Sequence, residues 1–500
     1  MNCDARLHLG TWCPITGSGG GHPLRLPTQH LVTHGVVVGM TGSGKTGLVT
    51  VLAEEALRAQ VPTIVIDVKG DLPNLLLSFP DFDPAVLGPW LEREGARDPH
   101  ELAELIEARR QALLAHGIAE PELRDLVHGS QVRVITPGSS AGEPLHILSS
   151  LERRSPLWDS DVECARATLS VSVSLLLRLL GRDPDPAKSK EHVLLCVLAE
   201  RRLRAGHNAD LAALMNDLEN PPLSTVGALS INSFLKKRDR ADLIAALNAL
   251  LAAPTFASWR EGASLDVSEW VKPRNGRTPC VIVSVAHLDD EERMLVLGVV
   301  FEEILSWVRT LPGSSELKAL VAFDEVYGFL PPHPKNPPTK RPLVALMKQA
   351  RAFGVGVVVA TQNPMDLDYR ALSNAGLWCI GRLQTDADRA RVVDGLASSV
   401  SGVDDAKELA RLLGSLGPRS FVVRNAHKPD IGNLLLYPRH TMSILRGPLT
   451  RHELKRALVQ RRMLSDQAPA AQTVSAQPNS GPSSPREPGS PGANVVPLFR

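Results

Sequence analysis

Short apolar runs rich in β-branched residues alternate with longer stretches of helical periodicity along most of this 500-residue chain. Early in the chain, the pattern predicts strands at 35–38, 63–68 and 132–136. Strand patterns return later, at 280–286, 319–324, 355–361, 377–380 and 420–423. Helical patterns lie between them, such as 48–57, 291–309 and 343–351. This alternation predicts an α/β fold with a mostly parallel sheet and helices on both faces.

The middle of the chain follows a different pattern. Helical periodicity runs without an intervening strand signal through 162–180, 190–204, 211–218 and 241–253. We therefore predict an inserted all-helical subdomain at 150–272, which divides the sheet domain into 1–149 and 273–465. From 466 to 500 the chain is rich in Pro, Ser, Gly, Ala and Gln and has almost no core-forming residues, which predicts a disordered tail.

The composition disfavours several classes of protein. The net charge is +1, so any contact with nucleic acid must come from a local basic patch. Six scattered cysteines without a C-x-x-C pair disfavour a zinc site or a disulfide framework. No apolar stretch approaches the ~18 residues of a membrane helix and no signal-peptide core is present, so we expect no membrane span and a cytoplasmic location.

The strand at 35–38 leads into a glycine-rich loop with a specific pattern. Residues 39–46 read GMTGSGKT and fit G-x-x-x-x-G-K-[ST] without a mismatch. Glycines let successive backbone N–H groups point inward, and the following helix adds the positive end of its dipole. We predict that the loop binds ATP through Gly39, Thr41, Gly42, Ser43, Gly44, Lys45, Thr46 and Gly47. The alternative is a glycine-rich turn that contains Lys-Thr by chance.

Individual side chains can be given roles within this prediction. Lys45 would reach the β- and γ-phosphates, and the Thr46 hydroxyl would take a Mg²⁺ coordination position. The strand at 319–324 ends in Asp324 and Glu325, and the carboxyl end of a parallel strand faces the ligand crevice. Asp324 would hold the Mg²⁺ opposite Thr46, and Glu325 would polarise the attacking water. The alternative is an ordinary strand exit whose acids face solvent.

Three more polar residues complete the candidate catalytic set. Gln362 directly follows the strand at 355–361, where it can sense the γ-phosphate or position the water. Arg351 ends the preceding helix, so it either caps that helix or acts as an arginine finger across a subunit interface. Arg382, at the end of the strand at 377–380, is the second candidate for the finger.

These motifs resemble those of one known family. Four strings, covering parts of 30–70 and 280–425, are similar to the HerA–FtsK group of P-loop ATPases and above all to its HerA-like branch: GMTGSGKT, DVKGD, VAFDE and QARAFGVGVVVATQNP. The resemblance implies a RecA-like core. In that core the strand ending at Gln362 lies between the phosphate-loop strand and the Asp-Glu strand, which places Gln362 between Gly44 and Glu325.

The resemblance also implies a homohexameric ring that pumps duplex DNA, with relatives that move other polymers or serve nuclease and secretion partners. The sequence departs from the family in one respect. HerA proteins carry a β-barrel before the phosphate loop, whereas 38 residues precede Gly39 here. The nuclease partnership and, to a lesser extent, the hexamer are therefore implied less directly.

We therefore expect an ATP-hydrolysing, Mg²⁺-dependent ring motor that translocates or unwinds DNA. The alternative is a switch or remodelling ATPase that acts on a protein partner in defence, secretion or assembly. A phosphoryl transferase is disfavoured because Glu325 and Gln362 suit the activation of water. The strongest basic run, 236–240, is either a DNA contact or a solvated helix end. The pattern at 451–462 predicts an amphipathic helix packed on the body.

Overall fold

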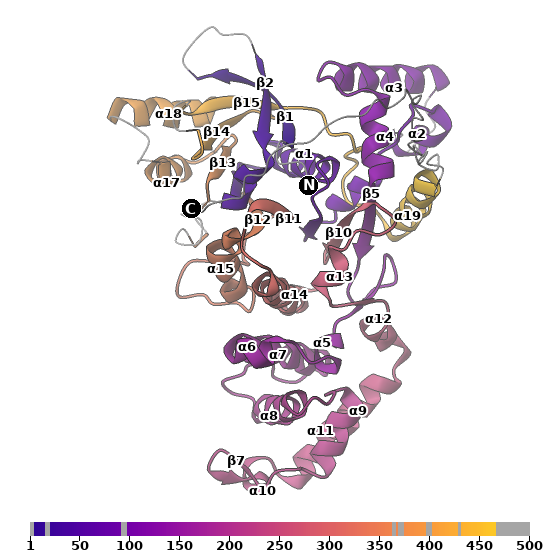
Figure 1. Cartoon of the computed structure of the whole chain (residues 1–500), viewed down its shortest axis with the longest axis vertical. Coiled ribbons are helices and arrows are strands. Elements are labelled where there is room, and N and C mark those ends of the chain that lie inside the picture. The colour runs from indigo at the N-terminus through magenta and orange to yellow at the C-terminus, as the bar shows by residue number, and fades with distance from the viewer. Residues whose placement is uncertain are drawn as a thin grey trace, which may run out of the picture.

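The structure is a computed structural model of the chain, and it describes residues 5–15, 21–91, 98–362, 367–368, 375–396, 403–428 and 432–466. The disordered tail predicted at 466–500 lies outside the described residues, apart from Asp466, which ends the last helix. Figure 1 shows two parts, a sheet covered by helices and, below it, a stack of helices.

The core is one large sheet with strands β1 (Arg6–Pro14), β2 (His22–Pro27), β3 (Gly35–Val38), β4 (Thr63–Asp67), β5 (Ser130–Ile135), β10 (Thr278–Ser284), β11 (Ser314–Asp324), β12 (Phe353–Thr361), β13 (Leu377–Ile380), β14 (Phe421–Asn425) and β15 (Leu434–Pro438). Their order is β2-β1-β15-β14-β13-β3-β12-β11-β4-β10-β5. Strands β13 to β5 in this order pair in parallel, whereas β2, β1, β15 and β14 join antiparallel. The predicted α/β fold with a mostly parallel sheet is confirmed.

Helices cover both faces of the sheet: α1 (Lys45–Arg58), α2 (Pro84–Leu91), α3 (Pro99–Leu114), α4 (Glu120–Gly129), α14 (Asp290–Thr310), α15 (Lys340–Gln349), α17 (Asp386–Leu396), α18 (Val403–Ser415) and α19 (Arg451–Asp466). One apolar layer joins α1, α4 and α19 to the sheet, and the other joins α14 and α15 to its opposite face. Alternate residues of β4 point to opposite layers. Val65 packs in the layer of α1, and Ile64 and Ile66 pack in the layer of α14. Burial on both faces explains why this strand reads as a continuous apolar run.

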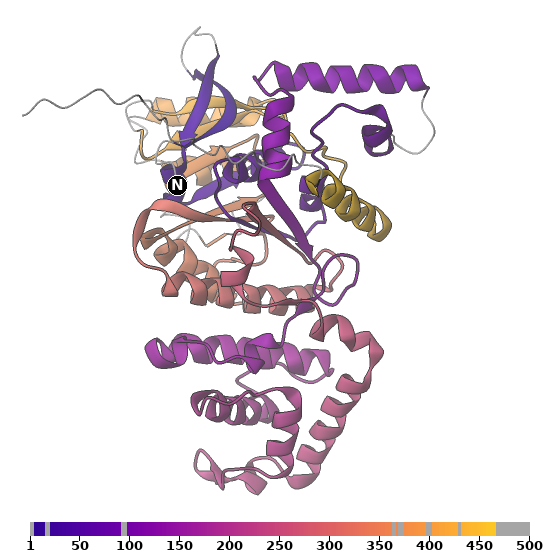
Figure 2. The same cartoon turned by 45° about the vertical axis from the view of Figure 1, so that its right-hand side comes forward.

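The helical stack contains α5 (Ser149–Glu152), α6 (Leu157–Ser160), α7 (Val162–Leu179), α8 (Lys190–Arg204), α9 (Leu211–Glu219), α10 (Ile231–Phe234), α11 (Lys237–Ala252), α12 (Ala257–Arg260) and α13 (Val267–Trp270). Helix α7 packs on α14 and so connects the stack to the sheet (Figures 1 and 2). The expectation that no strand interrupts this region is wrong at three two-residue strands, β7 (Thr225–Val226), β8 (Leu229–Ser230) and β9 (Ala263–Ser264). Two residues are too few to show an alternating pattern.

The basic run 236–240 lies at the start of α11. Lys236, Lys237 and Arg238 are exposed there. Arg240 is only 5% exposed. Its guanidinium donates hydrogen bonds to the backbone oxygens of Leu218 and Leu235. Arg240 therefore holds neighbouring segments of the stack together, and only the other three cations are available to a partner.

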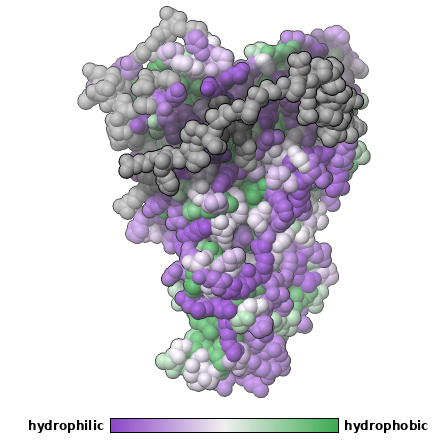
Figure 3. Space-filling view, viewed as in Figure 1, coloured by the Kyte–Doolittle hydropathy of each residue, from purple (hydrophilic) through white to green (hydrophobic). Residues whose placement is uncertain are grey.

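The surface is largely polar on the face that Figure 3 shows, with apolar residues gathered towards the lower end of the helical stack. Leu229, in the β7–β8 hairpin, is 51% exposed. In the part of the chain that the structure describes, no single helix is long and apolar enough to cross a membrane. One helix pair bent by 75°, Lys237–Ala252 with Pro254–Arg260, passes that test by length and composition.

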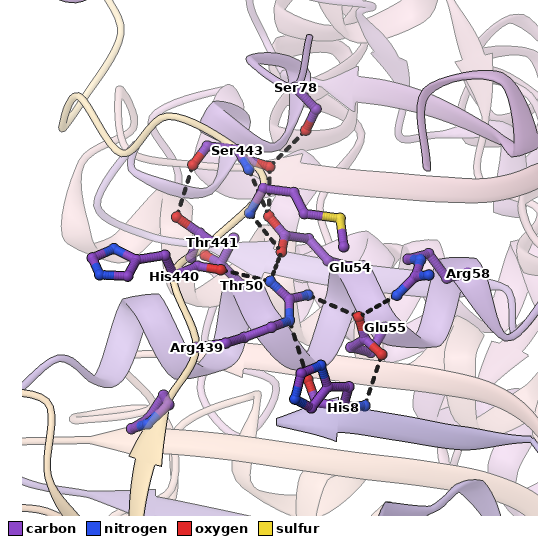
Figure 4. A network of polar contacts seen from close by, with 12 residues as sticks. His8, Thr50, Glu54, Glu55, Arg58, Ser78, Arg439, His440, Thr441 and Ser443 are labelled. Carbon is purple, nitrogen blue, oxygen red and sulfur yellow. Dashed lines mark hydrogen bonds and ion pairs between the residues drawn. The ribbon is translucent and has the colours of Figure 1, made fainter. Parts of the chain in front are cut away.

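A buried ion-pair network anchors α1, the helix that follows the phosphate loop (Figure 4). Arg439 comes directly after β15, and its side chain is 0% exposed. It donates to Glu54 Oε2 at 2.9 Å and to Glu55 Oε1 at 3.0 Å, and both acids lie on α1. The Glu54 carboxylate also accepts hydrogen bonds from the backbone N–H groups of Met442 and Ser443. The segment after β15 is thereby fixed to α1.

Candidate functional site

The loop at 39–46 is tightly built between β3 and the first turn of α1. Gly42 and Gly44 adopt φ angles of +78° and +96°, a region that favours glycine. A Cβ added at Gly39 would lie 2.6 Å from Ser43 Oγ, so a larger residue there would force Ser43 to move. The pattern of glycines therefore follows from the close turns of this loop.

Hydrogen bonds fix the loop to the strands on either side of β3. The Gly39 N–H donates to Thr361 O, at the end of β12, at 3.3 Å. The Met40 N–H donates to Arg382 O, just beyond β13, at 2.9 Å. The loop therefore lies at the carboxyl ends of these parallel strands, which is where ligands bind in open α/β sheets.

Lys45 begins α1, and its ammonium group folds back over the loop. Its Nζ donates to Gly39 O at 2.6 Å and to Met40 O at 3.0 Å. Burial lowers the pKa of Lys45, and the negative charges of Glu325 and Asp324 oppose this shift. The ammonium thus lies where the loop curls, close to both acids.

The Thr46 hydroxyl and the Asp324 carboxylate meet across the site. Thr46 Oγ1 donates to Asp324 Oδ2 at 2.7 Å. Asp324 is 4% exposed, and burial raises the pKa of its carboxyl group, opposed first by the Thr46 hydrogen bond. Among the described residues no group of three or more His, Cys, Asp and Glu side chains could hold a metal. One carboxylate and one hydroxyl are instead the kind of sparse oxygen set that Mg²⁺ uses beside substrate phosphates.

Gln362 connects the loop to Glu325. Thr41 Oγ1 donates to Gln362 Oε1 at 2.6 Å, and Gln362 Nε2 donates to Glu325 Oε2. The Gln362 backbone N–H also donates to Glu325 Oε1 at 3.3 Å. Strand β12 lies between β3 and β11, so the strand order agrees with the one that the resemblance implied. Glu325 itself has a φ of +64°, an uncommon conformation for a residue with a side chain.

The structure adds Lys69 to this site. Lys69 follows β4, and its Nζ donates to Glu325 Oε2 at 2.7 Å. The only trace in the sequence was the DVKGD string, which carries no chemical role by itself. A contact between residues this far apart in the chain depends on the pairing of β4 with β11.

Arg419 is the second residue that the sequence did not indicate. Its backbone N–H donates to Ser43 O at 2.9 Å, and a Cβ added at Gly44 would lie 3.0 Å from Arg419 Cγ. The guanidinium donates to the backbone oxygens of Pro438 and Arg439, and burial lowers its pKa. Arg419 therefore supports the phosphate loop from the side of β14 and β15.

The two candidate finger arginines lie at opposite ends of the parallel strands. Arg382 lies beside the loop, where its backbone oxygen accepts the Met40 N–H, and its side chain is exposed. Arg351 is exposed in the short 3₁₀ helix Ala350–Ala352, which precedes β12. The nine residues of β12 separate it from Gln362, roughly 30 Å at ~3.3 Å per residue. Arg351 therefore cannot reach the phosphate loop of its own chain.

The residues present fit a nucleoside triphosphate with Mg²⁺. Ser43 Oγ is buried in the loop and has no hydrogen-bond partner among the described residues, so a phosphate oxygen would satisfy it. Gly47 lies in the first turn of α1, where the helix dipole favours an anion. Thr46 and Asp324 supply hard oxygen ligands for Mg²⁺.

The fold and this site define a P-loop ATPase. Residues 8–123, which include the phosphate loop, match the family model described as helicase HerA, central domain. This match confirms the resemblance to the HerA-like branch of the HerA–FtsK superfamily. No curated protein matches the chain.

Three solved structures are similar to the chain at low identity. The bacterial conjugative coupling protein TrwB has 14% identity and a TM-score of 0.46, over 86% of this chain and 90% of that one. VirB4 of Thermoanaerobacter pseudethanolicus has 12% identity and a TM-score of 0.47, over 88% and 96%. The genome packaging NTPase B204 of Sulfolobus turreted icosahedral virus 2 has 16% identity and a TM-score of 0.24, over 36% and 73%.

Proposed function

We propose that this chain is an ATP-hydrolysing HerA-like motor that assembles as a homohexameric ring and translocates or unwinds DNA. The main support is the convergence of Thr46, Asp324, Glu325 and Gln362 beside one phosphate loop, from α1 and from the ends of β11 and β12. In this proposal 1–149 and 273–465 form the motor core, and 150–272 acts as a helical subdomain.

In the proposed mechanism each residue has one task. Lys45 holds the phosphates together with the backbone N–H groups of the loop, and Thr46 and Asp324 hold Mg²⁺. Mg²⁺ bound by these residues would neutralise part of the phosphate charge. Glu325 accepts a proton from the attacking water, and Gln362 positions that water from the neighbouring strand.

A ring supplies what a single chain lacks in this proposal. Arg351 is exposed and lies at the amino ends of the parallel strands, whereas its own phosphate loop lies at their carboxyl ends. From there it can act only on the site of a neighbouring subunit, where an arginine stabilises charge on the transferring phosphoryl group. Arg382, beside the loop, is the alternative if the finger acts from another position.

ATP hydrolysis measured with Mg²⁺, in the absence and presence of duplex DNA, single-stranded DNA and RNA, tests this function. We expect hydrolysis that duplex DNA stimulates. Lys45→Ala should abolish nucleotide binding, because it removes the ammonium that lies over the loop and would contact the phosphates. Unchanged ATP affinity in Lys45→Ala would overturn the phosphate-loop assignment.

The same assay separates the motor from its alternative. Hydrolysis that responds to none of the three nucleic acids would favour a switch that remodels a protein partner. Light scattering with a non-hydrolysable ATP analogue tests the ring independently, and a monomer under that condition would contradict the hexamer.

A further inference from the structure

Lys69 occupies a turn whose backbone is fixed by its neighbours. The turn follows β4, where Asp67 is 1% exposed. Asp67 Oδ1 accepts the Gly70 N–H at 2.9 Å, and its Oδ2 accepts the Ser284 hydroxyl at 2.7 Å. Gly70 has a φ of +89°, which lets the chain turn sharply after Lys69. The base of the Lys69 side chain is therefore held in place beside β11.

The Lys69 side chain has more conformational freedom than its backbone. It is 40% exposed, whereas the Glu325 side chain that it contacts is 11% exposed. A lysine carries its charge on a flexible four-carbon stem with three donors, so it can change partner without movement of the main chain. The ion pair thus joins a fixed carboxylate to a cation that can leave it.

Lys69 faces the same space as the proposed phosphate-binding residues. Its charge contributes to lowering the pKa of Lys45 and opposes the rise in the pKa of Asp324. Burial is the largest cause of both shifts. Two ammonium groups and two carboxylates therefore converge at the phosphate loop.

The ion pair also engages the carboxylate that the proposed mechanism uses as the proton acceptor. Glu325 Oε2 accepts hydrogen bonds from both Lys69 and Gln362 Nε2. Glu325 Oε1 accepts the Gln362 N–H at 3.3 Å. Three of the about four lone-pair sites of the carboxylate are thus engaged, which reduces its capacity to accept a proton from water.

We propose that Lys69 recognises the terminal phosphate of a bound nucleoside triphosphate by exchanging its partner from Glu325 to that phosphate. The exchange makes Glu325 available to water only when a triphosphate is bound. A terminal phosphate carries more negative charge than one carboxylate, so it attracts the ammonium more strongly at equal distance. This inference rests on the proposed ATPase function, and it assigns the residue that distinguishes triphosphate from diphosphate.

Equilibrium binding in the presence of Mg²⁺, with a fluorescent non-hydrolysable ATP analogue and with fluorescent ADP, tests the exchange without hydrolysis. Lys69→Met should weaken binding of the triphosphate analogue by roughly tenfold, the effect of one charge-assisted hydrogen bond. Binding of ADP should change by less than about twofold on the same scale. Lys69→Arg should retain part of the preference for triphosphate.

Lys318→Met is a matched control. Lys318 lies near the start of β11, and its Nζ donates to Pro312 O, far along the strand from Asp324. Its substitution should leave both affinities unchanged. Equal weakening of both nucleotides by Lys69→Met, or no weakening of either, would overturn the inference.

Glu325→Gln supplies a second, opposite test. It removes the carboxylate that competes for Lys69, so triphosphate binding should tighten several-fold relative to ADP, by less than about one order of magnitude. The double variant Lys69→Met/Glu325→Gln should not show this gain. A gain that persists without Lys69 would contradict the exchange.

Lys45→Ala keeps the inference and the proposed function distinguishable. If Lys45→Ala loses both nucleotides while Lys69→Met does not discriminate between them, the phosphate loop stands and the exchange is wrong. If Lys45→Ala binds both nucleotides normally, the proposed function itself fails.

Discussion

Two acidic pairs in this molecule are bound in different ways. Glu54 and Glu55 on α1 accept hydrogen bonds from the buried Arg439, from the buried Ser443 hydroxyl and from backbone N–H groups. Glu55 also accepts one from Arg58, which is 24% exposed. Asp324 and Glu325 accept theirs mainly from partly exposed side chains: a hydroxyl, an amide and an ammonium, with one backbone N–H at 3.3 Å.

The nature of the donors explains the difference in role. A backbone N–H or a fully buried guanidinium cannot change partner unless the fold opens, so the pair on α1 is structural. Side chains such as Thr46, Lys69 and Gln362 are partly exposed and can change partner when a ligand arrives. Adjacent acids thus identify a functional site only together with the donors around them.

The largest expected effect concerns an arginine that belongs to neither acidic pair of its own chain. If Arg351 acts on the neighbouring subunit, Arg351→Ala should leave ATP binding intact and reduce turnover by about 10³–10⁵. Mixing Arg351→Ala with Glu325→Gln protein should restore activity, because some interfaces then join an intact Glu325 site to an intact Arg351. Steady-state ATPase assays of the mixture measure this.

Lys348→Ala is the control for helix capping. Lys348 is exposed in the last turn of α15, so its loss tests the dipole effect alone, about 0.3–1 kcal/mol. An Arg351→Ala protein with normal turnover, or one that no partner complements, would refute the finger. The same pair of experiments would then be applied to Arg382.

The second prediction concerns the structural pair, Glu54 and Glu55, where a substitution should affect stability and not turnover. Arg439→Met leaves Glu54 and Glu55 without their buried counter-charge, so the free energy of unfolding should fall by about 3–5 kcal/mol. Turnover per folded molecule should change little. Urea denaturation and ATPase assays of the folded fraction measure the two quantities.

Arg58→Met is the matched control for this variant. Arg58 pairs with the same Glu55 at 2.9 Å, but its side chain is 24% exposed. Its loss should cost less than about 1 kcal/mol. If Arg439→Met costs no more than that, the buried network does not anchor α1.

The sequence predicted much of this architecture because the signals are local. The phosphate loop is one contiguous pattern, and the apolar runs before Asp324 and Gln362 predicted both strands. Lys69 and Arg419 were missed, because Lys69 meets Glu325 only through strand pairing and Arg419 meets Ser43 from β14. Strand β15, which lies between β1 and β14, was also missed, since its pattern LLLYP lacks a clear alternation.

The smallest expected effect concerns another acid, Glu303 on α14, whose side chain is 13% exposed and whose charge is poorly compensated. Burial raises the pKa of Glu303 to about 7. The nearby Arg153 opposes this rise, and Asp266 adds to it. Arg153 Nη2 lies 3.5 Å from Glu303 Oε1, while the same guanidinium pairs with Asp266. Among the described residues, Glu303 thus shares a 53% exposed arginine with Asp266, whereas the arginine that Glu54 shares with Glu55 is 0% exposed.

This arrangement fixes the sign of a pH effect. Because the folded pKa exceeds the unfolded value of 4.5, the folded protein holds the proton more tightly. The resulting stability is complete below pH ~4.5 and is lost as the pH rises to ~7. Glu303→Gln carries no such proton, so its unfolding free energy relative to the parent should rise by about 1–3 kcal/mol between pH 4.5 and 7.5.

Urea titrations of both proteins across this range measure the difference, and Glu104→Gln is the control because the Glu104 side chain is 70% exposed. A difference that stays flat for Glu303→Gln would show that Arg153 compensates Glu303 as completely as Arg439 compensates Glu54, and the contrast between well and poorly paired acids would then not hold.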